Sequence, residues 1–282
     1  MESWDVVVVG GGPAALRAAI ASADAGSSPL MIDSYGTGAA SGGAPTASLA
    51  ASIEETDSSA HLDDTIAAGG DSVNEGAASR ICSQAVSTLA ELEKWGLVLR
   101  RTDAGLPHAS DAPGHTRPRM TGCGDSTLRE VTRILEEQAI KRSIPRRTDI
   151  VPISLVMDNQ QVRGIVAFDL MSGQVVSIQA KAVILATEGH QGMWSDASQG
   201  AGEGAAMAAQ AGANLSGMAN TPKHALTISG TDLKLPFDLL GSGGRLRRAD
   251  GEDVGPEAVL NGEQCVLDLR FLDSESGVWF AQ

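Results

Sequence analysis

The first 33 residues constrain the fold of this 282-residue chain more than any other segment. Residues 5–9 are an acid followed by four valines, a run typical of a strand buried on both faces of a parallel sheet. Three glycines follow at 10–12, and residues 13–25 are alanine-rich with a proline in the first turn, as at the start of a helix. A second apolar run, residues 30–32, leads into Asp33. This order predicts a β-α-β unit.

The glycine turn fits the dinucleotide-binding pattern G-x-G-x-x-G/A, with Ala15 at the third position. Gly10 permits a sharp turn out of the strand, and Gly12 lets a pyrophosphate approach the backbone, because a Cβ there would collide with it. The helix that begins at Pro13 and Ala14 presents N–H groups and a positive dipole end to the phosphates. We therefore predict that this segment binds a dinucleotide.

Two further features extend the predicted site. Asp33 follows Gly12 by 21 residues, where a carboxylate accepts hydrogen bonds from ribose hydroxyls, and Ser34 lies beside it. Residues 182–186 form another apolar strand that ends in small residues suited to close contact with a cofactor, namely Ala186, Thr187 and Gly189. The glycine pattern alone does not separate FAD from NAD, and a glycine-rich turn in an ordinary α/β domain is the plain alternative.

The rest of the chain alternates helical and strand patterns. Strand-like runs over 150–157, 161–169 and 174–178 predict a small antiparallel meander. Helices are predicted over 77–95, 126–139 and 201–211, and one late strand over 266–269.

Composition excludes several classes of function. The net charge of −14 leaves no basic stripe that could neutralise nucleic-acid phosphates. Three widely spaced cysteines form no CxxC pair, so neither a metal site nor a disulfide framework is expected. The apolar runs are only as long as strands, which predicts no membrane span, and the N-terminus lacks a signal-peptide pattern. A cytoplasmic protein is expected, with peripheral association at a membrane left open.

The order of these pieces resembles the flavoprotein subunit family of succinate dehydrogenase and fumarate reductase, to which L-aspartate oxidase is related. Residues 39–43 look like that family's Ser-Ala-Gln-Gly-Gly loop beside the flavin, and residues 61–69 like its His-x-x-Asp-Thr-x-x-Gly segment. Residues 202–208 follow its Thr-Gly-Asp-Gly-x-x-Met-Ala turn, and Ala-Thr-x-Gly at 186–189 is similar to its second flavin motif. The resemblance adds Ser41, Gly42, Gly43 and Glu203 to the predicted cofactor-binding residues.

The resemblance implies an α/β fold: a Rossmann-like FAD-binding domain with a small antiparallel β-meander and a rudimentary capping region. The predicted domains are residues 1–222 for FAD binding and 223–282 for a remnant of the capping, or substrate, domain. The family's covalent-flavin His should fall near Gly36, where no His occurs, so noncovalent FAD is expected. The implied partner is an iron–sulfur subunit or a complementary flavoprotein half.

The substrate half departs from the family pattern. His224 falls where the family has its substrate His, which makes it the one candidate for substrate binding, although a surface His is the alternative. Ser242 replaces the acid of the Gly-Glu-Gly-Gly turn, Leu240 replaces an Arg, and residues 236–237 are Pro-Phe instead of Thr-Glu. No proton-delivering Arg matches, because the arginines at 245, 247 and 248 are expected to be a solvated patch.

These departures leave several functions open. The first is an FAD-dependent oxidoreductase of the succinate dehydrogenase and fumarate reductase type, incomplete for dicarboxylate chemistry. The second is a noncatalytic FAD-binding module. The third is a fragment that requires a second polypeptide, since the chain stops before the family's final flavin-binding helix. An NAD-dependent Rossmann enzyme is disfavoured by the flavin-type segments.

Overall fold

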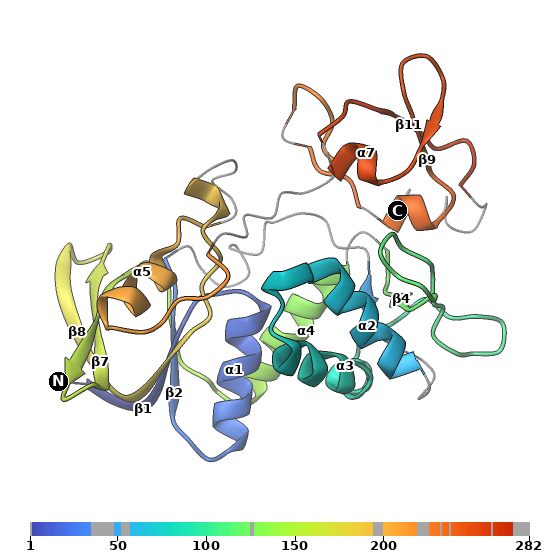
Figure 1. Cartoon of the computed structure of the whole chain (residues 1–282). Helices are drawn as coiled ribbons and strands as arrows, with labels where there is room; N and C mark the ends of the chain where they lie inside the picture. Colours follow the sequence, from blue (N-terminus) through green and yellow to red (C-terminus); the bar gives the residue numbers. More distant parts are fainter. Residues whose placement is uncertain are drawn as a thin grey trace. The chain divides into compact units, whose positions relative to one another are not determined.

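The computed structural model describes residues 2–34, 48–51, 57–124, 127–193, 200–218, 226–231, 233–236, 238–260 and 262–272 (Figure 1). By their internal contacts, residues 1–43 and 131–223 form unit 1, and residues 44–130 and 224–282 form unit 2. The division falls within helix α4 (Thr127–Lys141). Residues 44–130 thus group with the C-terminal segment, and the functional division into domains 1–222 and 223–282 stays a prediction.

A mixed sheet forms the centre of unit 1. Over the described residues it has six strands in the order β5-β2-β1-β8-β7-β6. The strands β5, β2, β1 and β8 run parallel, and β7 and β6 continue the sheet antiparallel. Their bounds are β1 (Glu2–Val9), β2 (Pro29–Ile32), β5 (Arg146–Arg147), β6 (Ile150–Asp158), β7 (Gln161–Asp169) and β8 (Gln174–Leu185).

Strand β8 joins the meander to the parallel sheet. The sequence predicts two separate strands, residues 174–178 and 182–186, but the structure has one continuous strand. Gln179 and Lys181 resemble a break between strands, yet both lie on the exposed face while Ala180 between them is buried. The period-2 alternation of a strand therefore continues through this polar stretch.

The core of unit 1 is apolar and lies on both faces of the sheet. Helix α5 (Glu203–Gln210) places Met207 in a buried cluster with Val7 and Val9 of β1. Val8 points to the other face by strand alternation, where α1 (Pro13–Asp24) buries Leu16. This double cover explains why β1 is a continuous run of valines.

Unit 2 is built from helices and very short strands. Helix α2 (Ser58–Gly69) precedes a 3₁₀ turn (Gly70–Ser72) and packs against α3 (Glu75–Trp95). Asn74 caps α3 by accepting a hydrogen bond from the backbone of Ala77, and Gly96 ends it in the left-handed conformation. The remaining elements are β3 (Leu49–Ala50), β4 (Met120–Thr121), α6 (Asp238–Gly241), β9 (Arg245–Arg247), β10 (Asp253–Val254), α7 (Glu257–Leu260) and β11 (Val266–Asp268).

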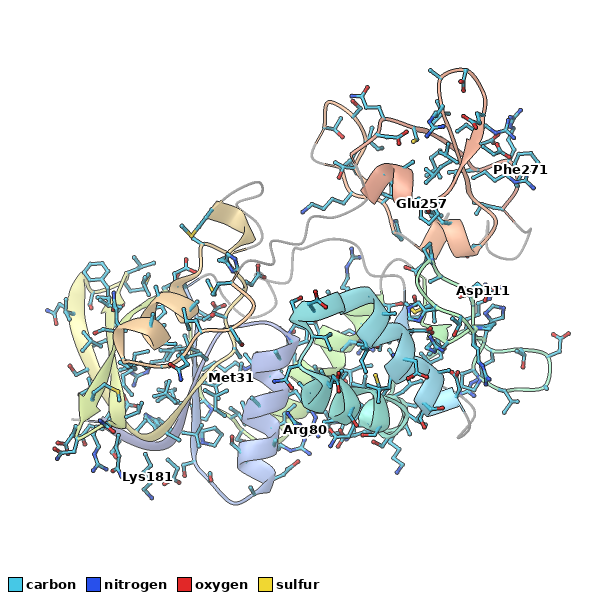
Figure 2. The ribbon with its side chains drawn as sticks, in the orientation of Figure 1. Met31, Arg80, Asp111, Lys181, Glu257 and Phe271 are labelled. Carbon is cyan, nitrogen blue, oxygen red and sulfur yellow. The ribbon has the colours of Figure 1, made fainter. Side chains whose placement is uncertain are left out.

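The arginines around β9 are not the solvated patch that the sequence suggests. Arg247 Nε lies 2.7 Å from Asp253, and Arg248 pairs with two glutamates. The guanidinium of Arg245 lies 4.0 Å from the ring centroid of Phe271, which Figure 2 labels. Charge pairing and stacking on the ring hold these side chains in a local network.

In the part of the chain that the structure describes, no helix has both the length and the apolar character needed to cross a bilayer.

Candidate cofactor site

Three strand ends in unit 1 meet at one edge of the sheet. Val9 pairs with Ile32 of β2 on one side and with Leu185 of β8 on the other. Past these pairs, the Gly10 N–H donates to Ile32 O at 2.9 Å, and the Ala186 N–H donates to Val9 O at 2.9 Å. The glycine turn, Asp33 and the Ala-Thr-Glu-Gly turn therefore begin side by side. Ligands of open α/β sheets bind outside this carboxyl edge.

Gly10 occupies a position that only glycine can fill. Its φ is +132°, and a Cβ built on it would lie 2.3 Å from the carbonyl oxygen of Ala186. The sharp turn that the sequence predicts is present, and its tightness lets β1 and β8 stay paired up to the turn.

Gly12 differs from Gly10, because its backbone does not require glycine. It is the N-cap of α1, with φ −84° and ψ −178°, an extended conformation open to any residue. Among the described residues no side chain caps the helix, and its first turn carries no acid. The first N–H groups of a helix have no partner within the helix, so α1 can offer them to an anion. Pro13 and Ala15 occupy the expected places, with Ala15 fully buried and Ala14 exposed.

Asp33 is held by backbone contacts on both sides. Its N–H donates to Arg147 O at 3.0 Å, and its carbonyl accepts from Ile150 N at 3.1 Å. Its Oδ1 accepts the Ser34 N–H at 2.8 Å. These bonds place a half-buried carboxylate next to the glycine turn, as the sequence predicts.

The turn after β8 packs against the start of α5. Gly202 N donates to Gly189 O at 3.1 Å. A Cβ at Gly204 would lie 2.0 Å from Thr187 Oγ1, so the two turns touch. Glu203, between these glycines, is exposed in the first turn of α5. The structure therefore brings together the Ala186–Gly189 turn and Glu203, two segments that the sequence assigns to the cofactor.

Sequence reasoning missed two members of this double turn. A Cβ at Gly200 would lie 2.6 Å from Gly189 O, so this position also needs glycine. His190 packs its Cβ against Gly202, and its Nε2 is buried without a hydrogen-bond partner among the described residues. The G-x-G-x-G spacing of residues 200–204 could have identified Gly200, whereas nothing in the pattern around His190 distinguishes it.

Four predicted residues lie outside the described part of the chain: Ser41, Gly42, Gly43 and His224. Their assignments stay predictions. The described residues fit a dinucleotide on two counts, namely an uncapped helix start without acids for the phosphates and a positioned carboxylate for a ribose.

Known proteins match most of this chain. A family model described as FAD binding domain matches residues 5–266. A fumarate reductase (CoM/CoB) flavoprotein from Methanothermobacter marburgensis is 29% identical over 94% of this chain and 51% of its own length. The succinate dehydrogenase flavoprotein subunit of Rickettsia bellii is 29% identical over 89% of this chain and 44% of its own. The chain thus spans about half the length of the curated relatives it matches.

Solved structures agree on the fold. A quinol fumarate reductase flavoprotein from E. coli superposes with a TM-score of 0.76 at 23% identity, covering 89% of this chain and 45% of that one. The α/β fold and the resemblance to succinate dehydrogenase and fumarate reductase flavoproteins are confirmed, and FAD is supported over NAD. The chain belongs to the FAD binding domain family.

Proposed function

We propose that unit 1 binds FAD noncovalently at the carboxyl edge of β2, β1 and β8, and that the protein is a flavin-dependent oxidoreductase component. In this proposal the pyrophosphate lies at the N-terminus of α1 beside Gly12, and Asp33 accepts hydrogen bonds from the ribose. The turns at 186–189 and 200–204 face the remainder of the cofactor. FAD supplies the electron transfer, and these residues bind and orient it.

One observation carries the proposal: a glycine stands at position 12 although its extended backbone would accept any side chain. An ordinary helix gains about 1 kcal/mol from Ser, Thr, Asn or Asp at its N-cap, as α3 does from Asn74. Leaving α1 without such a cap keeps its N–H groups available and leaves room for a phosphate group.

The test is titration of the purified chain with FAD, followed by flavin fluorescence. D33N should weaken binding about tenfold or more, because a hydrogen bond to a charged group contributes about 1.5–3 kcal/mol. D158N removes an acid at the β6–β7 hairpin and should bind FAD like the parent. Equal affinities for all three proteins, or no FAD uptake by any, would contradict the proposed site.

Noncovalent attachment has its own test. The absence of His near Gly36 supports it. Acid precipitation of the FAD-loaded protein should release all flavin into the supernatant, and flavin retained in the pellet would contradict the proposal.

For the substrate side, we propose that this chain alone does not reduce fumarate. Unit 2 has a cavity of about 490 Å³ next to the turn that starts at Gly241. Its lining carries the carboxylates of Asp111 and Asp253 but a single guanidinium among the described residues, that of Arg245, which pairs with Asp253 at 3.5 Å. Such a lining disfavours a dianion, since burying negative charge requires unpaired cations.

Ser242 supports the same conclusion. It stands where the related family has an acid, it is buried, and its N–H donates to Asp238 O at 3.1 Å. The FAD-loaded chain should therefore give no fumarate-dependent oxidation of a reduced viologen dye, whereas turnover would contradict this part of the proposal and leave FAD binding untouched. An iron–sulfur subunit or a complementary flavoprotein half remains the proposed partner.

A further inference from the structure

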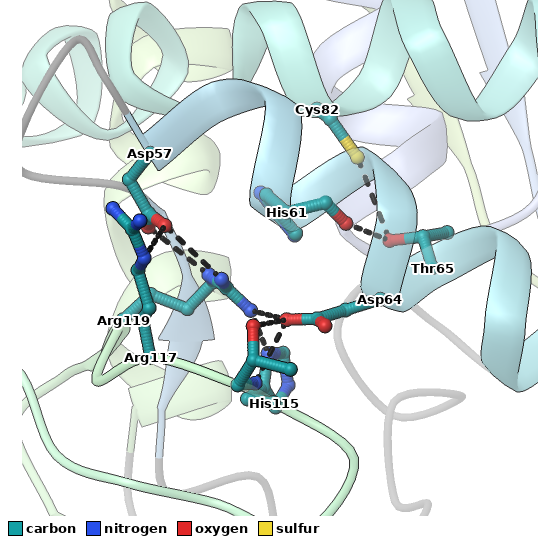
Figure 3. A network of polar contacts seen from close by, with 9 residues as sticks. Asp57, His61, Asp64, Thr65, Cys82, His115, Arg117 and Arg119 are labelled. Atoms are coloured by element: carbon teal, nitrogen blue, oxygen red, sulfur yellow. Dashed lines mark hydrogen bonds and ion pairs between the residues drawn. The ribbon is translucent and has the colours of Figure 1, made fainter.

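Unit 2 buries a charged cluster that the cofactor site does not use (Figure 3). At its centre is Arg119, whose side chain is 0% exposed. Its Nε and Nη2 donate to the two oxygens of Asp57, each at 3.2 Å, and its Nη1 donates to Asp64 Oδ2 at 2.5 Å. Asp57 and Asp64 belong to the start and the body of α2, so the guanidinium joins this helix to the segment that precedes β4.

A second bond ties the same segment to α2. The backbone N–H and the hydroxyl of Thr116 both donate to Asp64 Oδ2, at 2.9 and 3.0 Å. Asp64 therefore accepts three hydrogen bonds from residues 116–119. Because Asp111, Ala112 and Pro113 of the adjoining chain line the unit 2 cavity, the cluster lies beside the cavity wall.

The neighbouring His115 must be neutral for this arrangement to hold. Arg119 Nη1 lies 2.7 Å from His115 Nδ1. A guanidinium has only donors, so Nδ1 must be the acceptor, and the single ring proton of His115 must sit on Nε2. A proton added at Nδ1 would abolish this bond and place two cations in contact.

We propose that His115 is a proton-sensitive latch of unit 2, which in its neutral form holds residues 115–119 on α2 and on protonation releases them together with the adjoining cavity wall. His115 is only half-buried, so solvent protons can reach it. Arg119, by contrast, has no exposed surface through which water could replace the lost acceptor.

The charged groups that face His115 determine the sign of this effect. Burial lowers the pKa of His115, and the Arg119 charge lowers it further, against Asp64, Asp238 and Asp57, which act to raise it. A folded-state pKa below the unfolded value means that the latch is fully closed above about pH 6.5 and is lost as the pH falls through the lower folded value.

Two other groups of the cluster titrate differently. Burial opposes ionisation of Asp64, but hydrogen bonds from Thr116 and Arg119 outweigh it and lower the pKa of this carboxyl, so it stays charged well below the His range. His61 lies with its ring centroid 6.3 Å from that of His115, and burial also lowers its pKa. Within the described residues its Nδ1 has no hydrogen-bond partner to lose, which separates it from His115.

Hydrogen exchange of the full chain, read by mass spectrometry, tests the latch. After correction for intrinsic exchange, peptides covering residues 110–121 should lose about tenfold in protection between pH 7.5 and pH 5.5, the size expected for losing a hydrogen bond to a charged group. Peptides from β1 and β2 should keep their protection. Unchanged protection of residues 110–121 would overturn the proposal.

The variants separate the latch from general acid lability. H115N keeps an acceptor near the Nδ1 position without a titrating ring, so its protection at pH 5.5 should match that at pH 7.5. H108N changes another His of the same segment and should respond like the parent. A persistent loss in H115N, or abolition of the loss by H61N instead, would overturn the assignment to His115.

Discussion

Unit 1 and unit 2 bury different kinds of side chain. In unit 1 the fully buried side chains around the sheet are apolar, such as Leu16, Ile20 and Ile32. In unit 2 the largest fully buried side chain is that of Arg119, held between two carboxylates. Apolar burial stabilises in proportion to area and does not titrate, whereas a buried ion cluster depends on every partner and on pH.

Their helices also begin differently. Helix α1 of unit 1 starts at Gly12 without a side-chain cap from the described residues, whereas α3 of unit 2 starts at Asn74, whose Oδ1 accepts the Ala77 N–H at 2.9 Å. The capped helix has satisfied its own donors. The uncapped one keeps them for a ligand, which is the difference expected between a structural helix and a phosphate-binding one.

The largest effect should come from R119A. Removing one partner of a buried ion pair leaves two uncompensated carboxylates and should lower the free energy of unfolding of unit 2 by about 3–5 kcal/mol. Urea denaturation followed by hydrogen exchange of the α2 and α3 peptides measures it. R101A removes an arginine that is about half exposed and pairs with Glu93, and it should cost less than about 1 kcal/mol. Equal losses would remove the contrast.

The next effect tests the apolar core of unit 1. I32A deletes a side chain with 0% exposure and should cost about 2–5 kcal/mol through lost burial and the cavity left behind. V175A, on the exposed face of β8, should stay under about 1 kcal/mol in the same urea titration. We expect both values to be the same at pH 7.5 and 5.5, because neither involves a titrating group.

A glycine pair sharpens the account of the cofactor edge. G10A forces a Cβ into the carbonyl of Ala186 and should cost about 1–3 kcal/mol, with loss of FAD binding. Gly26 also has positive φ, but a Cβ there meets nothing within 4 Å. G26A should therefore cost only about 1 kcal/mol and bind FAD normally. Loss of FAD binding in G26A would show that instability, not the clash, is responsible.

The smallest effect concerns the capped helix. N74A removes the cap of α3 and should lower the unfolding free energy by about 1 kcal/mol, measured by urea denaturation. N74S, which can still accept the same hydrogen bond, should recover most of that loss. No change in N74A would mean that the two helix starts differ less than their geometry indicates.

Local sequence signals predicted unit 1 well and unit 2 poorly. The valines of β1, the glycines at 10–12 and Asp33 act over short separations, so their periodicity and spacing identify strand, turn and acid directly. The continuity of β8 was missed because Gln179 and Lys181 look like a turn until two neighbouring strands pair with them. The paired arginines around β9 were missed for the same reason, since Asp268 is distant in sequence from Arg247.

The sequence by itself determined the β-α-β unit, the position of its uncapped helix start and the family, since each depends on residues only a few positions apart. Tertiary structure alone decided which distant segments meet: the 186–189 turn against Gly204, and Arg119 between Asp57 and Asp64. Such meetings join residues tens of positions apart through hydrogen bonds that leave no periodic trace in the chain. The charge state required of His115 follows only from that packing.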